Sequence, residues 1–190
     1  MFRDNFLENV LNWENIRNSS RIKNISILSI STITGKAISG MFWLYLAGLM
    51  GEESYGELGY LIAIAGITSN VVLIGGVWTM TVYTAKKVDV QPVLYLISII
   101  SSGISAFILY FIFQNAGLSI FVIGFVIFNL TLAEVNGRKL YTDYSKFFIL
   151  QKIFFVLISL GLFQFIGPEG ILIGYGLSYI PFFKRMYISL

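Results

Sequence analysis

The chain has 190 residues, of which 56% are hydrophobic and 12% charged, and its mean hydropathy is +0.79. Soluble domains carry about 25% charged residues, so this composition is typical of an integral membrane protein. The net charge of +3 is small and dispersed and does not suggest a nucleic-acid partner, and the absence of His and Cys excludes disulfides, thiol nucleophiles, imidazole bases and the usual zinc sites. We expect a protein that is not an enzyme and has neither catalytic residues, nor a metal, nor a cofactor.

Residues 1–24 mix charged side chains with apolar ones at helical spacing, namely Phe2, Phe6, Val10 and Trp13. An amphipathic helix of this kind lies at the membrane surface with its aromatic rings dipped inward. The pattern predicts a cytoplasmic or interfacial amphipathic segment over 1–24, with an ordinary solvated helix as the alternative.

Residues 25–190 consist of long apolar runs separated by short polar turns. A helix needs about 20 residues to cross the hydrocarbon of a bilayer. We therefore predict an all-α, polytopic membrane bundle, a six-helix transmembrane lobe over 25–190. Its expected crossings are 25–50, 58–84, 93–113, 118–133, 147–166 and 171–183, the last being short and interrupted by glycines and Pro181.

Lys36 lies near the middle of the first expected crossing, on a polar stripe with Ser29, Thr32, Ser39, Gly40 and Trp43. A lysine at the bilayer centre costs about 2.5–3.5 kcal/mol on insertion scales, so it should face the bundle interior or a watery cavity. There it could bind a phosphate or pyrophosphate group. The alternative is a lysine that snorkels or pairs with a carbonyl.

Two asparagines join Lys36 as candidate substrate-binding residues. Asn70 lies near the middle of the second crossing, and Asn129 shares a face of the fourth with Ala133 and Asn136. Buried amides of this kind line transport paths or form hydrogen bonds between helices. For Asn70, the alternative to substrate binding is a hydrogen bond to a neighbouring helix.

Three further patterns concern packing and the membrane interface. Ser31, Gly35 and Ser39 form a ladder of small residues that lets a neighbouring helix approach closely, and Glu134 precedes Arg138 by one helical turn and can pair with it. A mixture of basic and aromatic residues over 138–152, including Lys152, predicts a segment anchored at the headgroups.

Basic residues mark one side of the predicted bundle. The side of the N-terminus is expected to carry Lys86, Lys87, Arg138, Lys184 and Arg185. The turns on the opposite side carry Glu52, Glu53, Glu57 and Glu169. The positive-inside rule then places both termini in the cytoplasm of a multi-pass cell-membrane protein.

The turn between the first two crossings reads Leu-Ala-Gly-Leu-Met-Gly-Glu-Glu-Ser-Tyr-Gly over 46–56. It resembles the signature Leu-Ala-Arg-Leu-Leu-Gly-Pro-Glu-acid-Tyr-Gly of polysaccharide-type flippases of the multidrug/oligosaccharidyl-lipid/polysaccharide superfamily. Residues 75–85 and the turn 167–170 are similar to further parts of that family's first lobe. Gly48 and Val82 stand where the family often has arginine.

The resemblance implies the N-terminal lobe of a flippase for lipid-linked oligosaccharide or polysaccharide precursors in cell-surface glycan biosynthesis. Its expected partners are membrane lipids, a lipid-linked glycan and a second six-helix lobe, supplied by another copy or another chain. The alternatives are a non-transporting assembly subunit of a glycan-synthesis complex, a truncated remnant, or half of a multidrug exporter. The chain has no nucleotide-binding motif, so an ATP-driven motor within it is excluded.

Overall fold

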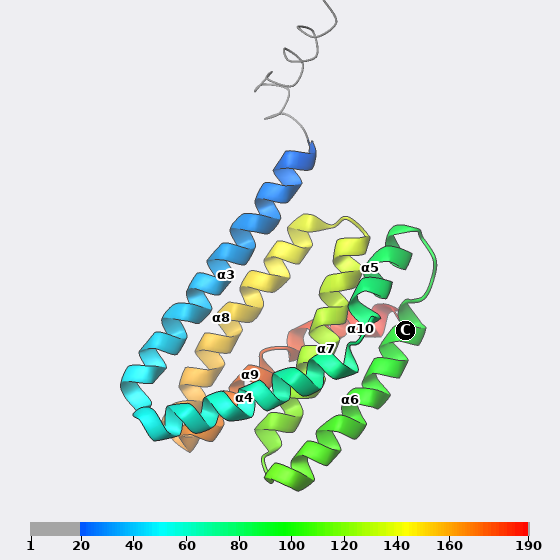
Figure 1. Ribbon diagram of the computed structural model, residues 1–190. Coiled ribbons are helices and arrows are strands. Elements are labelled where there is room, and N and C mark those ends of the chain that lie inside the picture. The colour runs from blue at the N-terminus through cyan, green and yellow to red at the C-terminus, as the bar shows by residue number, and fades with distance from the viewer. Residues whose placement is uncertain (1–19, 190) are drawn as a thin grey trace, which may run out of the picture.

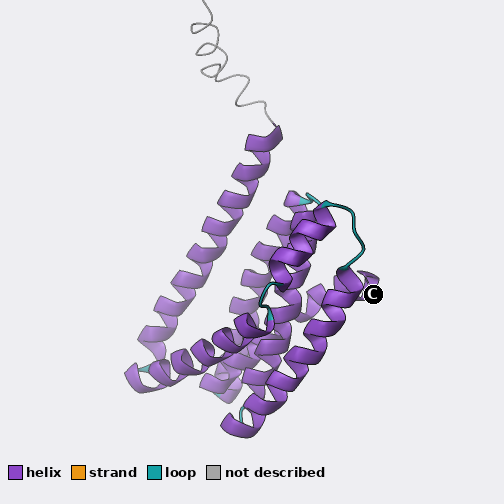
Figure 2. Ribbon diagram, turned by 45° about the vertical axis from the view of Figure 1, so that its right-hand side comes forward, coloured by secondary structure: helices purple, strands orange, loops and turns teal. Residues whose placement is uncertain are grey.

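The computed structural model describes residues 20–189, and every regular element in this range is a helix (Figures 1 and 2). The predicted interfacial segment over 1–24 lies mostly outside the described residues and stays a prediction. The helices are α3 (Ser20–Met50), α4 (Glu52–Val72), α5 (Gly76–Ala85), α6 (Gln91–Phe113), α7 (Ala116–Gly137), α8 (Tyr141–Ile166), α9 (Pro168–Leu177), the 3-10 helix η1 (Ile180–Phe182) and α10 (Phe183–Ser189).

Among residues 20–189, four helices are long and apolar enough to cross a membrane, namely α3, α6, α7 and α8. The pair α4 and α5 adds a fifth candidate if it is counted as one span bent by 47°. These helices are consistent with the predicted all-α multi-pass membrane protein.

The expected sixth crossing over 171–183 is divided between α9, η1 and the start of α10. The 10 residues of α9 would span only about 15 Å, half of a hydrocarbon core. Pro181, which has no backbone N–H to donate, lies in the first turn of η1, where the chain leaves the α-helical path. The count of six crossings stays a prediction.

Turn residues mark several helix ends. α4 ends just before Gly75, which adopts the left-handed conformation at φ 73°, and Pro92 lies in the first turn of α6. The side chain of Asn115 caps α7 by accepting a hydrogen bond from the backbone N–H of Leu118 at 3.1 Å. α6 begins close to the crossing expected from residue 93, whereas the break near Gly75 divides the crossing expected over 58–84.

The two ends of the bundle differ in charge. The turns at residues 51, 114–115 and 167 lie together at one end, and the loops over 86–90 and 138–140 lie at the other (Figure 1). The first end carries Glu52, Glu53, Glu57 and Glu169, and the second carries Lys86, Lys87, Arg138 and Lys139.

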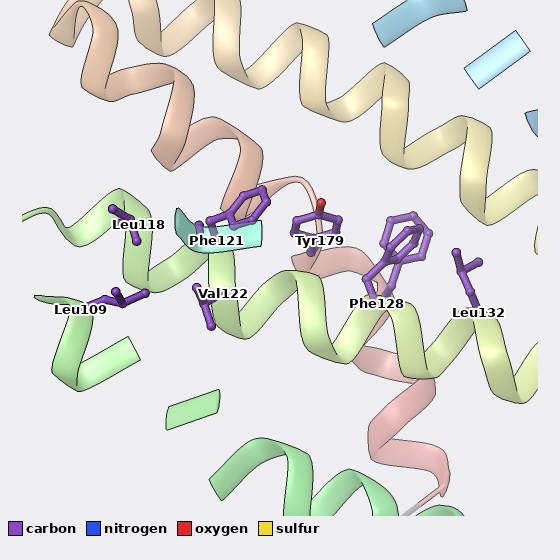
Figure 3. Packing of buried hydrophobic residues seen from close by; sticks show 9 residues of the cluster. Leu109, Leu118, Phe121, Val122, Phe128, Leu132 and Tyr179 are labelled. Atoms are coloured by element: carbon purple, nitrogen blue, oxygen red, sulfur yellow. The ribbon is translucent and has the colours of Figure 1, made fainter. Parts of the chain in front are cut away.

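α7 forms the centre of the bundle. It packs against α4, α5, α6, α8 and α9, and 67% of its apolar stretch is buried, against 17% for α3 and α8. Its contact with α9 is close because Gly124 has no side chain: a Cβ there would lie 3.0 Å from the carbonyl oxygen of Gly176 in α9, and 2.7 Å from Cδ2 of Tyr179, which follows α9. Tyr179 packs between Phe121 and Phe128 in the main core cluster (Figure 3).

α3 and α8 pack side by side and run parallel to each other, and the predicted ladder of small residues makes this contact. A Cβ at Gly35 would lie 2.5 Å from Cε1 of Phe148 on α8. One turn away, the hydroxyl of Ser145 lies 3.0 Å from that of Ser31. The close approach of a neighbouring helix along this ladder is therefore confirmed.

Candidate functional site

Lys36 is the central residue of the apolar span Ile22–Met50 and its side chain is exposed. No acidic residue within the part of the chain that the structure describes forms a salt bridge with it. Its neighbour on the polar stripe, Ser39, has a buried hydroxyl oxygen without a hydrogen-bond partner in the same range.

Asn70 and Asn129 satisfy their amides locally. Asn70 is exposed near the end of α4 and donates to the carbonyl of Gly66 at 2.8 Å, and the half-buried Asn129 donates to the carbonyl of Phe125 at 2.8 Å. Neither bond crosses between helices, because each carbonyl lies one turn back in the same helix. α3 and α4 diverge from their shared turn (Figure 1), so the structure does not bring Asn70 to Lys36.

Lys152 is a candidate residue that the sequence analysis placed elsewhere. It lies near the centre of α8, because this helix begins at Tyr141 and not at residue 147, where the crossing was expected to start. Its Nζ atom lies over the rings of Phe148, at 5.5 Å from the centroid, and Tyr175, at 5.8 Å. The apolar runs on both sides of Lys152 were a signal for this position.

Lys36 and Lys152 lie at the same level of the α3–α8 pair. The Cγ atom of Lys152 would lie 3.4 Å from a Cβ at Gly35, which directly precedes Lys36. Further along, the ring of Phe42 packs on that of Phe155 with centroids 4.6 Å apart. Because the two helices are parallel and these contacts fix their register, both lysines lie at about the same height.

Ser39 and Gln151 complete this level. Ser39 falls between the two packed positions of α3 and so lies opposite the turn of α8 that carries Gln151 and Lys152. Gln151 is fully buried, and its Nε2 atom donates to the hydroxyl of Ser178 at 2.9 Å. Its Oε1 atom has no partner among the described residues. We call Lys36, Ser39, Gln151 and Lys152 the mid-span polar layer.

A second polar cluster surrounds Glu134 at the basic end. Arg138 donates from Nε to Oε1 of Glu134 at 2.8 Å, which confirms the predicted pair. Arg185 approaches the same oxygen with Nη2 at 3.7 Å, and the hydroxyl of Tyr95 donates to Oε2 at 3.1 Å. The buried carboxylate therefore has partners from α6, α7 and α10.

The arginines of this cluster line a pocket of about 350 Å³, which we call the arginine pocket. The sequence did not indicate that Tyr95 and Arg185 interact with Glu134, because it is the fold that brings α6 and α10 to this residue. The residues that line it are Asp89, Gln91, Pro92, Glu134, Arg138, Arg185 and Ile188.

A further pocket of about 320 Å³ lies at the acidic end, lined by Glu57, Glu169 and Asn115 among others. The side-chain oxygen of Asn115 already caps α7. In the range that the structure describes, no group of three or more acidic residues is placed to hold a metal ion.

A comparison of the chain with protein-family models, curated proteins and solved structures finds no match. Membership of the flippase superfamily therefore stays a prediction that rests on the quoted motifs.

Proposed function

We propose that the chain is one lobe of a membrane transporter that moves a lipid-linked oligosaccharide or polysaccharide precursor across the membrane. The observation that carries the proposal is the mid-span polar layer, in which two lysines lie at the same level of neighbouring apolar helices.

The physical argument starts from the free energy of the charges. Each lysine at this depth costs about 2.5–3.5 kcal/mol on insertion scales, and two cations at one level also repel each other. Within residues 22–188, no carboxylate forms a salt bridge with either lysine. A bound anion offsets both effects, and the phosphate groups of a lipid-linked sugar are anions that must cross this depth.

Unsatisfied oxygens support the same reading. A buried polar atom without a partner costs about 1–3 kcal/mol, so the hydroxyl of Ser39 and the Oε1 atom of Gln151 favour water or a ligand at this level. The rings of Phe148 and Tyr175 hold the Lys152 ammonium without neutralising it. Lys152 thus stays a cation available to a ligand.

A complete path requires a second lobe, because alternating access involves two lobes around a central site. In this proposal the exposed Lys36 and Asn70 lie on surfaces that the second lobe covers. The mass of the complex extracted gently from its native membrane tests this part. A dimer or a complex with another six-helix chain is expected, and a lone monomer of 21.4 kDa would favour the assembly subunit or the remnant.

The transport test uses the native complex in proteoliposomes that contain a fluorescent polyprenyl diphosphate sugar. Lys36→Ala and Lys152→Ala should each slow flipping about tenfold, because a charge-assisted hydrogen bond contributes about 1.5–3 kcal/mol. Lys146→Ala is the control, since Lys146 is exposed near the basic end of the same α8. Unchanged flipping by both mid-span variants, with normal expression, would refute the role of the layer.

A further inference from the structure

The arginine pocket offers more donors than Glu134 uses. Arg138 contacts the carboxylate through Nε alone, and Arg185 is 3.7 Å from it through Nη2. The Nη atoms of Arg138 have no hydrogen-bond acceptor within the described range. A guanidinium has five N–H donors in a planar fork, so two of them around one carboxylate leave several directed into the pocket.

The charges around the pocket favour an anion at the arginines. Glu134 balances one of the two guanidiniums, and among the described residues that line the pocket the second is opposed only by Asp89, which is exposed at the rim. No salt bridge ties Asp89 to a described residue. Exposed lysines of the neighbouring loops, Lys87 and Lys139, add positive charge at this end.

The surroundings of the pocket are those of a membrane surface. Pro92 lines the pocket, and Leu96 and Ile100 follow at one-turn steps on the same face of α6, with exposed fractions of 54% and 55%. On the other wall, Ile188 at 69% exposure lies in α10. An apolar strip therefore leads from the pocket along a helix long enough to cross the bilayer.

We propose that the arginine pocket binds the phosphate of a membrane phospholipid headgroup, with an acyl chain along the exposed face of α6. Guanidinium groups match phosphate with paired hydrogen bonds, and basic pockets between membrane helices bind lipid headgroups. A headgroup here bridges α6, α7 and α10. The site is independent of the transported cargo, because it lies at the basic end and not at the mid-span polar layer.

Native mass spectrometry of the complex, released from micelles containing phosphatidylglycerol, tests the proposal. Diacylglycerol with the same chains is the phosphate-free comparison, and inorganic phosphate is the comparison without chains. Retention of phosphatidylglycerol at least tenfold above both is expected. Equal retention of diacylglycerol would show binding by chains alone, and equal retention of inorganic phosphate would show a free-anion site; either would overturn the proposal.

Variants locate the bound lipid. Arg185→Gln should weaken retention about tenfold, the loss expected when one charge-assisted bond is removed. Lys184→Gln changes the same charge on an exposed neighbour outside the pocket and should leave retention unchanged. Asp89→Asn should strengthen retention about two- to fivefold, because it removes the carboxylate at the rim.

Arg185→Gln should weaken lipid retention and Asp89→Asn should strengthen it, and this difference in direction separates a lost binding site from a folding defect. A destabilised pocket would weaken retention in every variant, whereas a phosphate site requires Asp89→Asn to strengthen it. Equal weakening by Arg185→Gln and Lys184→Gln would show attraction to the basic surface in general and would overturn the proposal.

Discussion

Replacement of Gly174 by alanine should push α8 and α9 apart. A Cβ at this position would lie 2.6 Å from the Cα atom and 2.7 Å from the backbone nitrogen of Ser159. Because these are backbone atoms, no side-chain rotation relieves the collision, and the helices must separate by roughly 1 Å to restore ordinary carbon contacts. Such a movement also strains the bond of about 1 kcal/mol from the Ser159 hydroxyl to the carbonyl of Ile171.

The magnitude follows from three effects. Overpacking costs about 1–3 kcal/mol, here toward the upper value, and the strained hydrogen bond adds to it. Alanine recovers about 1 kcal/mol through its higher helix propensity. The net loss in free energy of unfolding should be about 2 kcal/mol.

The assay is unfolding in dodecyl maltoside micelles with increasing sodium dodecyl sulfate, followed by circular dichroism. Gly161→Ala is the matched control, because Gly161 lies in α8 with nothing within 4 Å of its Cβ position. It should be neutral or stabilise by up to about 1 kcal/mol. If Gly174→Ala unfolds at the same detergent fraction as Gly161→Ala, the close contact between α8 and α9 is not as described.

The same titration checks two other contacts. Tyr95→Phe should lower stability by about 1–2 kcal/mol, because it removes the hydroxyl that donates to the buried carboxylate of Glu134, whereas Tyr110→Phe at an exposed position should have no effect. Asn115→Ala should cost about 1 kcal/mol by removing the cap of α7, and Asn115→Ser should retain most of it. A loss with Asn115→Ser as large as with alanine would argue against the cap.

The presence of the long helices was predictable, because apolar length and turn residues act locally. Pro92 and Asn115 lie where α6 and α7 begin, close to the crossings expected from residues 93 and 118, whereas the break at Gly75 falls inside the crossing expected over 58–84. The division of residues 171–183 into three short helical segments was harder to predict from the sequence. A run of apolar residues does not show whether it crosses the bilayer, since glycines such as Gly174 serve close packing equally well.

The candidate site was predictable only where its partners lie one turn apart. Glu134 and Arg138 share a helix, so spacing revealed their pair. Arg185 joins them through the fold, and Lys152 lies level with Lys36 through the register of α3 on α8, which depends on the contact at Gly35. The spacing of residues within one helix does not show how that helix is aligned along its neighbour.

The central position of α7 has a consequence for biogenesis. This helix is as apolar as α6, with a hydropathy of 2.2, yet it is 67% buried where α6 is 22% buried. α8 and α9, which cover part of it, are synthesised later, so a newly inserted α7 first meets lipid on the faces that they will occupy. Water exclusion gives little driving force for this exchange within a bilayer. Gly117 and Gly124 leave room for close packing of α9 and Tyr179 against α7. This close packing favours the replacement of lipid by α9 after α9 has been synthesised.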